Sequence, residues 1–139
     1  MSRLLFVCVE NSCRSQMAEA WAHKLFPTEW TALSGGLLTY PISDNTRGAM
    51  AEVGLDMAGQ KTKTFDQFDL DSFDLVVTLS NEAGRYLPSL ADPKRHLHKP
   101  VTDPMSATGS PEEILDAFRE GRDRIKLIVQ DVIANGSHI

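Results

Sequence analysis

The chain has 139 residues, 42% of them hydrophobic, and a formal net charge of −5 at pH 7. This length and composition predict a single domain, residues 1–139, with one core. The acidic balance disfavours nucleic acid as a partner, and no stretch approaches the roughly 20 apolar residues of a membrane span. The first predicted strand follows Met1, Ser2 and Arg3 directly, so we expect no signal peptide, no membrane partner and a cytoplasmic location.

Short apolar runs alternate along the chain with segments of helical periodicity. The predicted strands are residues 4–9, 30–34, 74–79 and 95–98. The predicted helices are residues 15–25, a helix from Asp44 or Asn45 that ends before Gly54, a short helix at 81–87, and a long helix that opens at the capping box Ser110-Pro111-Glu112-Glu113. Alternating strands and helices predict an α/β fold, a three-layer sandwich with parallel strands.

The most informative motif places Cys8, five residues and Arg14 between the first predicted strand and helix. Such a turn aims backbone N–H groups and the positive helix end at one point. A sulfur held there is favoured as thiolate, below the pKa of roughly 8.5 of a free cysteine. The same groups accept a tetrahedral oxyanion, which the planar fork of Arg14 grips. We therefore predict a nucleophile within an oxyanion site; the alternative is a buried structural cysteine. The predicted oxyanion-binding residues are Val9, Glu10, Asn11, Ser12, Cys13, Arg14 and Ser15.

The string CVENSCRSQMAE, from Cys8 to Glu19, resembles the signature of thioredoxin-coupled arsenate reductases, within the low-molecular-weight protein tyrosine phosphatase superfamily. The likeness extends over essentially the whole chain. It includes Ser34-Gly35-Gly36, residues 52–56, residues 74–79 and Asp103-Pro104. The resemblance implies four parallel strands in the flavodoxin-like arrangement of the low-molecular-weight phosphatases. The specific string favours the reductase branch over the tyrosine phosphatases.

We predict that Cys8 attacks the bound oxyanion and forms a covalent adduct, while Arg14 stabilises the developing charge. Ser15 can donate a hydrogen bond to the thiolate. Asp103 follows the last predicted strand, at the edge where open sheets bind ligands, which predicts a general acid. The resemblance implies the same role for Asp103. Met105-Ser106-Ala107 follow it, so no ring is available there to stack on phosphotyrosine.

Other residues are predicted to support the loop. The resemblance suggests that Asn11 adopts a left-handed conformation and ties the loop to Ser34. It also implies a potassium ion beside the loop, held by residues that match Asn11, Glu19 and Ser34. Because this chain has Lys61-Thr62-Lys63 nearby, a lysine ammonium can substitute for the ion, and we predict no metal. His96 and His98 have no further ligands in register, which disfavours zinc.

Two residues of the loop are harder to interpret. Glu10 opposes anion binding so close to the nucleophile, and we expect it to point to solvent. Cys13 faces either helix packing or the pocket, and it is a possible redox partner of Cys8. The two further cysteines through which the reductases pass electrons are missing from residues 79–87, where Ser80 stands in place of the first. The electron donor is then Cys13 or an external thiol: thioredoxin, glutaredoxin or a small thiol.

The sequence favours an arsenate reductase, with a low-molecular-weight phosphatase that hydrolyses phosphotyrosine or aryl phosphates as the alternative. The same residues serve both, because arsenate and phosphate share geometry and charge. A non-catalytic phosphate-binding module is a third interpretation, and it requires an unreactive thiol. We expect no tightly bound cofactor and a monomer.

Overall fold

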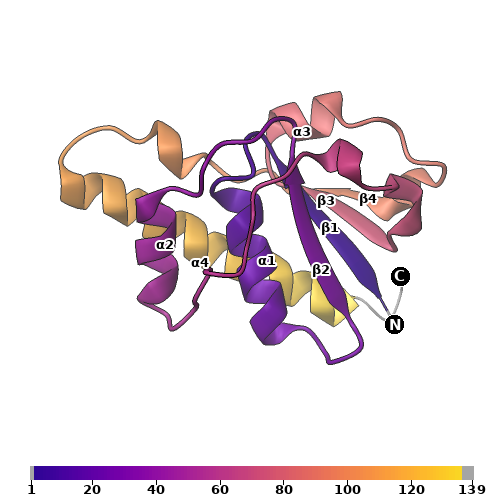
Figure 1. The fold of residues 1–139 in the computed structure, drawn as a ribbon, viewed down its shortest axis with the longest axis horizontal. Helices are drawn as coiled ribbons and strands as arrows, with labels where there is room; N and C mark the ends of the chain where they lie inside the picture. The colour runs from indigo at the N-terminus through magenta and orange to yellow at the C-terminus, as the bar shows by residue number, and fades with distance from the viewer. Residues whose placement is uncertain (1, 136–139) are drawn as a thin grey trace.

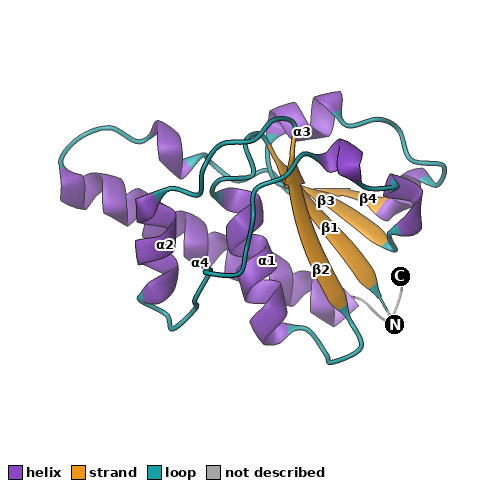
Figure 2. Ribbon diagram, viewed as in Figure 1, coloured by secondary structure: helices purple, strands orange, loops and turns teal. Residues whose placement is uncertain are grey.

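The computed structural model describes residues 2–135, and the remaining ends of the predicted domain, residues 1 and 136–139, lie outside the described residues. A four-stranded sheet forms the centre of the molecule, with strand order β2-β1-β3-β4 and every neighbouring pair parallel (Figures 1 and 2). The strands are β1 (Arg3–Cys8), β2 (Thr31–Gly36), β3 (Leu75–Thr78) and β4 (His96–His98). The helices are α1 (Arg14–Leu25), α2 (Asp44–Ala51), α3 (Asn81–Tyr86) and α4 (Pro111–Asn135).

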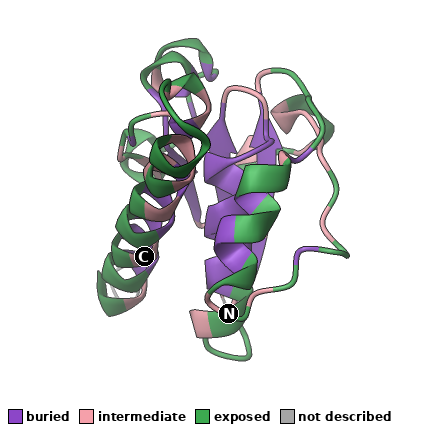
Figure 3. Cartoon of the chain, turned by 90° about the vertical axis from the view of Figure 1, so that its left-hand side faces the viewer, coloured by how far each residue is buried: buried purple, intermediate pink, exposed green. Residues whose placement is uncertain are grey.

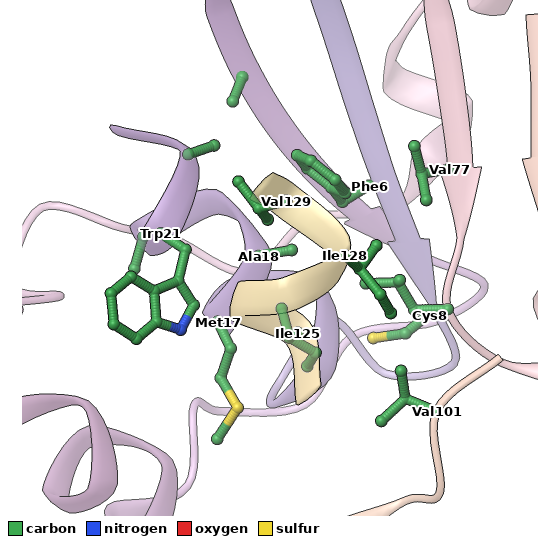
Figure 4. Packing of buried hydrophobic residues seen from close by; sticks show 14 of the residues in the cluster. Phe6, Cys8, Met17, Ala18, Trp21, Val77, Val101, Ile125, Ile128 and Val129 are labelled. Carbon is green, nitrogen blue, oxygen red and sulfur yellow. The ribbon is translucent and has the colours of Figure 1, made fainter. Parts of the chain in front are cut away.

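Helices cover both faces of the sheet (Figure 1), which confirms the predicted three-layer α/β fold. On one face, α1, α2 and α4 enclose the larger core cluster, which includes Phe6, Trp21 and Ile125. Figure 4 shows side chains from β1, β3, α1 and α4 meeting in this cluster. On the other face, Leu5 and Val7 belong to a second core cluster with Ala83, which lies in α3, and Leu87, which directly follows α3. The buried residues concentrate in the sheet and in the helix faces against it (Figure 3).

Strand β1 lies inside the sheet, where it pairs in parallel with β2 on one side and with β3 on the other. Its residues from Leu4 to Val7 are completely buried, as expected for a strand covered on both faces. Its last residue, Cys8, pairs in register with Gly36 at the end of β2. The sheet therefore delivers Cys8 to the carboxyl edge, where the connections to α1, α2 and α3 begin.

The predicted elements are all present, with ends that differ by one or two residues. Ser110 and Glu113 form the predicted capping box, in which each side chain accepts the other's backbone N–H at 3.1 Å. Gly54, predicted to follow the second helix, has a φ of +79°. Four 3₁₀ turns were not predicted, and one of them, Pro104–Ser106, follows Asp103 directly.

Two further findings concern the hydrophobicity of the helices and the two histidines of β4. No helix within residues 2–135 is long and apolar enough to cross a membrane. His96 and His98 both contact Thr78, whose Oγ1 lies 2.9 Å from Nε2 of His96 and 2.7 Å from Nδ1 of His98. Burial lowers the pKa of His96 below 6.5, with a smaller contribution from the neighbouring His98.

Candidate active site

Cys8 lies at the end of β1 with 2% of its surface exposed, and the chain then turns through residues 9–13 into α1. Within the described residues, none of the backbone N–H groups of residues 10–14 donates a hydrogen bond to another group of the chain. The first turn of α1 also has no side-chain cap, although helices usually satisfy these donors. The loop thus presents a set of donors that an oxyanion can accept.

Arg14 begins α1 and is 6% exposed. Its Nη1 donates a 2.8 Å hydrogen bond to the carbonyl oxygen of Val101, and its Nη2 lies 3.7 Å from Oδ2 of Asp103. A cation is unfavourable at a helix N-terminus unless an anion is present. The fixed guanidinium therefore suits an anion held above the loop.

The sulfur of Cys8 is the last group in a short series of hydrogen-bonded polar side chains. Oγ of Ser15 lies 2.9 Å from Sγ of Cys8, and Nδ2 of Asn11 donates to the same Oγ at 2.8 Å. Because the Asn11 amide occupies an acceptor position of Ser15, the hydroxyl hydrogen is free to point at the sulfur. The predicted contact between Ser15 and Cys8 is present, and the hydroxyl is placed to donate to the sulfur.

Asn11 has a φ of 53°, the left-handed conformation that was expected, and asparagine tolerates it better than most residues. Its Oδ1 accepts from Nε2 of Gln16 at 2.9 Å and from the backbone N–H of Lys63 at 2.9 Å. Gln16 also donates to the carbonyl oxygen of Lys61 and accepts from Gln60. The sequence did not point to Gln16, Gln60 or the Lys63 backbone, because a lone glutamine after the motif has no spacing signal.

The expected tie between Asn11 and Ser34 is wrong. Oγ of Ser34 donates instead to Oε1 of Glu19 at 2.8 Å, because the Asn11 side chain is already held by Gln16 and Lys63. Ser34 therefore supports α1 and not the loop itself.

The ammonium of Lys63 lies 3.6 Å from Oε1 of Glu19, in agreement with the expected lysine next to that carboxylate. It also donates to the carbonyl oxygen of Lys61 at 2.9 Å. The Glu19 carboxylate thus already has a cation. Glu19, Ser34 and Asn11 consequently do not fit a potassium ion in addition.

Asp103 precedes the 3₁₀ turn and caps it, since its Oδ1 accepts the backbone N–H of Met105 at 3.0 Å. Its Oδ2 faces Arg14, and its side chain is 41% exposed. Asp103 lines the small pocket over Cys8 together with Met105, whose sulfur accepts a 3.2 Å hydrogen bond from Oγ of Ser12. The structure therefore brings the predicted acid and the predicted nucleophile to one pocket.

Cys13 lines the same pocket and is only 2% exposed, so packing and pocket are both correct descriptions of its place. Both cysteines are free thiols. Burial raises the pKa of Cys13 to about 12, and a hydrogen bond with Thr46 opposes the shift in part. Cys13 is consequently a protonated thiol near neutral pH.

Glu10 had been expected to point to solvent. It is half-buried and lines both the pocket over Cys8 and an adjoining cavity of about 410 Å³. The carbonyl oxygen of Glu10 faces the segment 37–43 and accepts the N–H of Tyr40 at 3.1 Å. A further cavity of about 560 Å³ lies elsewhere, beside residues such as Asp74, Arg95 and Asp131.

The segment 37–43 runs beside the loop and is joined to it by backbone hydrogen bonds, while its Ile42 is buried in the core cluster that also contains Cys8 and Cys13. The hydrogen bonds join the N–H groups of Leu37, Leu38, Tyr40 and Ser43 to the carbonyl oxygens of Cys8, Val9, Glu10 and Ser12. The side chains of Leu38 and Tyr40 are 50% and 58% exposed. Sequence reasoning missed this segment, since backbone pairing outside strands leaves no pattern in the sequence.

A family model described as low molecular weight phosphotyrosine protein phosphatase matches residues 3–135 of the chain. The chain belongs to this family. Several curated relatives of the chain are named arsenate reductase. That of Halalkalibacterium halodurans is 40% identical over 122 residues, 88% of each chain. The arsenate reductase of Bacillus subtilis is 38% identical over 122 residues, which again cover 88% of each chain.

Solved structures of the family have the same fold. One described as an arsenate reductase in the phosphate binding state is 30% identical, with a TM-score of 0.84, and the alignment covers 97% of this chain and 98% of that one. A low molecular weight protein tyrosine phosphatase from T. tengcongensis has a TM-score of 0.80 at 24% identity, over 97% and 99% of the two chains, which shows the fold alone. The family and the fold expected from the sequence are both confirmed.

Proposed function

We propose that this protein is an arsenate reductase that converts arsenate to arsenite through a thiol adduct on Cys8. One observation carries the proposal. Cys8 lies under a loop of unpaired N–H donors, 2.9 Å from Ser15, with the guanidinium of Arg14 fixed beside the same pocket. Its relatives named arsenate reductase, at 34–40% identity, favour arsenate as the substrate over other tetrahedral oxyanions.

In the proposed reaction the Cys8 thiolate attacks arsenic, and an oxygen of arsenate leaves as water after protonation. The loop N–H groups and Arg14 stabilise the charge that develops on the remaining oxygens. Asp103 supplies the proton from Oδ2, because its Oδ1 is engaged with the N–H of Met105. Ser15, oriented by Asn11, donates a hydrogen bond to the Cys8 thiolate until the attack.

A thiol must then reduce the adduct, and we propose an external thiol as the donor. Thioredoxin, glutaredoxin and small thiols are the candidate classes. Cys13 is the internal candidate, but a buried thiol with a pKa raised to about 12 is a poor nucleophile. The proposal further includes a monomer in the cytoplasm, where a reducing compartment keeps Cys8 reduced, without a tightly bound cofactor.

The direct test is arsenite formation from arsenate with a panel of thiol donors, for the wild type and for Cys8→Ser and Cys13→Ser. Cys8→Ser should retain the fold and less than about a tenth of the turnover, because the nucleophile is lost. Cys13→Ser should turn over normally once an external thiol is supplied. More than about a tenth of the wild-type turnover in Cys8→Ser would refute the covalent mechanism, and no arsenite from the wild type with any donor would refute the reductase assignment.

A phosphatase acting on aryl phosphates is the second candidate, and the family match together with exposed Tyr40 beside the loop favours it. An aromatic side chain there could stack on an aryl group, which Met105 cannot do. Arsenate and an aryl phosphate should be compared side by side. A non-catalytic binding module would leave Cys8 unreactive, so iodoacetamide labelling of Cys8 at about pH 6, suppressed by phosphate, would exclude that class.

A further inference from the structure

The cavity of about 410 Å³ adjoins the pocket over Cys8, and the two share part of their walls. The shared residues are Val9, Glu10, Arg14 and Asp103. Asn81 and Glu82, at the start of α3, close the far side of the cavity. Its volume lies in the range of small-molecule sites, roughly 300–1,000 Å³. A molecule in this cavity is therefore next to any adduct on Cys8.

The proposed reaction requires such a molecule. Reduction of arsenate to arsenite takes two electrons, and each thiol that enters a disulfide supplies one. The chain has only two cysteines, Cys8 and Cys13. Burial raises the pKa of Cys13 to about 12, which makes it a poor nucleophile, and we therefore take the second sulfur from outside the protein.

The charges of the cavity decide which thiol it accepts. Three acidic residues line it, Glu10, Glu82 and Asp103, against one basic lining residue, Arg14. Arg14 already donates to Val101 and faces the oxyanion site, so a bound anion neutralises it. The remaining field is negative, which attracts cationic groups and repels carboxylates. Asn81 and Thr102 add polar side chains to the wall.

We propose that this cavity is the binding site of the reducing thiol, and that it selects a small thiol that carries an ammonium group. The inference rests on the arsenate reduction proposed above. It also gives a role to Glu10, a carboxylate that is otherwise unfavourable beside an anion site. The acidic group discriminates between reductants at the expense of some attraction for the oxyanion.

The step balances as follows. The thiolate of the incoming thiol attacks Sγ of Cys8, the sulfur–arsenic bond breaks, and its electron pair stays on arsenic, which becomes arsenite. A mixed disulfide between Cys8 and the thiol forms at the same time. A second molecule of the thiol attacks this disulfide, releases the oxidised thiol and restores Cys8. Overall, arsenic acid and two thiols give arsenous acid, one disulfide and one water.

The test uses three small thiols of different charge: cysteamine, 2-mercaptoethanol and 3-mercaptopropionate. The rate constant for each thiol is measured at saturating arsenate for the wild type, Glu10→Gln and Glu82→Gln. Intrinsic thiol reactivity cancels when the ratio of cysteamine to 3-mercaptopropionate is compared between variants. Each substitution should lower this ratio by about two- to fivefold, the effect of one partly exposed charge pair. Glu29→Gln, which removes an exposed carboxylate before β2, is the matched control and should leave the ratio unchanged.

A second measurement needs no variant. Ethanolamine, which has the ammonium but no thiol, should compete with cysteamine, whereas propionate should not. Equal ratios in the wild type and both variants, or no competition by ethanolamine, would overturn the inference while arsenate reduction stands. Activity with a redoxin protein and with none of the small thiols would overturn it as well. No arsenite with any donor would instead refute the proposed function itself.

Discussion

Replacement of Asp103 by asparagine separates the chemical role of this residue from its structural role. The carboxylate makes two contacts, one through Oδ1 to the N–H of Met105 at 3.0 Å and one through Oδ2, 3.7 Å from Arg14. An asparagine keeps an Oδ1 that accepts the same N–H, so the cap of the 3₁₀ turn survives. It loses the ionisable oxygen and the attraction to Arg14.

The two losses differ in size. The Asp103 side chain is 41% exposed, and its Oδ2 lies beyond hydrogen-bond distance from Nη2 of Arg14. Removal of this ion pair should therefore cost roughly 0–1 kcal/mol of folding free energy. Loss of a general acid typically slows a reaction by about 10²–10⁴-fold, which corresponds to about 2.7–5.4 kcal/mol of barrier. Asp103→Asn should therefore fold nearly as stably as the wild type and turn over far more slowly.

The assay combines thermal unfolding with turnover of arsenate and of aryl phosphates whose leaving groups span a range of acidity. The defect should be largest for arsenate and for poorly acidic phenols, because these leaving groups need a proton. It should shrink for nitrophenols, which depart as anions. An equal loss for every leaving group, or a loss that follows the unfolding temperature, would show that Asp103 is only a turn residue.

Three further substitutions test the packing and the electrostatics. Gly36→Ala should abolish turnover, because a Cβ there would lie 2.5 Å from a backbone carbonyl oxygen and 2.8 Å from the backbone nitrogen of Asn11; wild-type activity would mean that the loop tolerates displacement. Ile125→Ala, at a fully buried position, should cost about 2–5 kcal/mol in urea unfolding, whereas the exposed Leu127→Ala should cost much less. A hydrogen bond from Arg119 lowers the pKa of Glu52 from 4.5 to about 2. Because the folded pKa is depressed, the contribution of Glu52 to stability is complete above pH 4.5 and is lost as the pH falls toward 2. The stability difference between the wild type and Glu52→Gln should therefore disappear over that range, and a constant difference would contradict the shift.

The fold was predictable because its signals are local. The buried run of β1, the capping box at Ser110 and the glycine after α2 each encode one element in adjacent residues. The 3₁₀ turns were not predictable in the same way. Three residues make too short a repeat to show periodicity, and their polar composition resembles that of any loop.

The site was predictable only where the motif contains it. Cys8, Arg14 and Ser15 lie within eight residues of one another, and Asp103 was found because it follows the last strand. The partner of Asn11 was predicted incorrectly, since Lys63 is 52 positions away and contributes a backbone N–H that every residue type except proline possesses. For Glu10 the sequence showed the charge but not that the residue would line two adjoining pockets, because that depends on where distant residues such as Asp103 lie.

The attachment of the segment 37–43 has a consequence for protein engineering. Because main-chain hydrogen bonds and the buried Ile42 hold this segment in place, its exposed side chains at positions 38 and 40 contribute little to the geometry around the sulfur. Libraries at these two positions can therefore vary the entrance to the active site while the catalytic residues keep their arrangement. Selectivity among bulky substrates or protein reductants is then open to directed evolution separately from catalytic power.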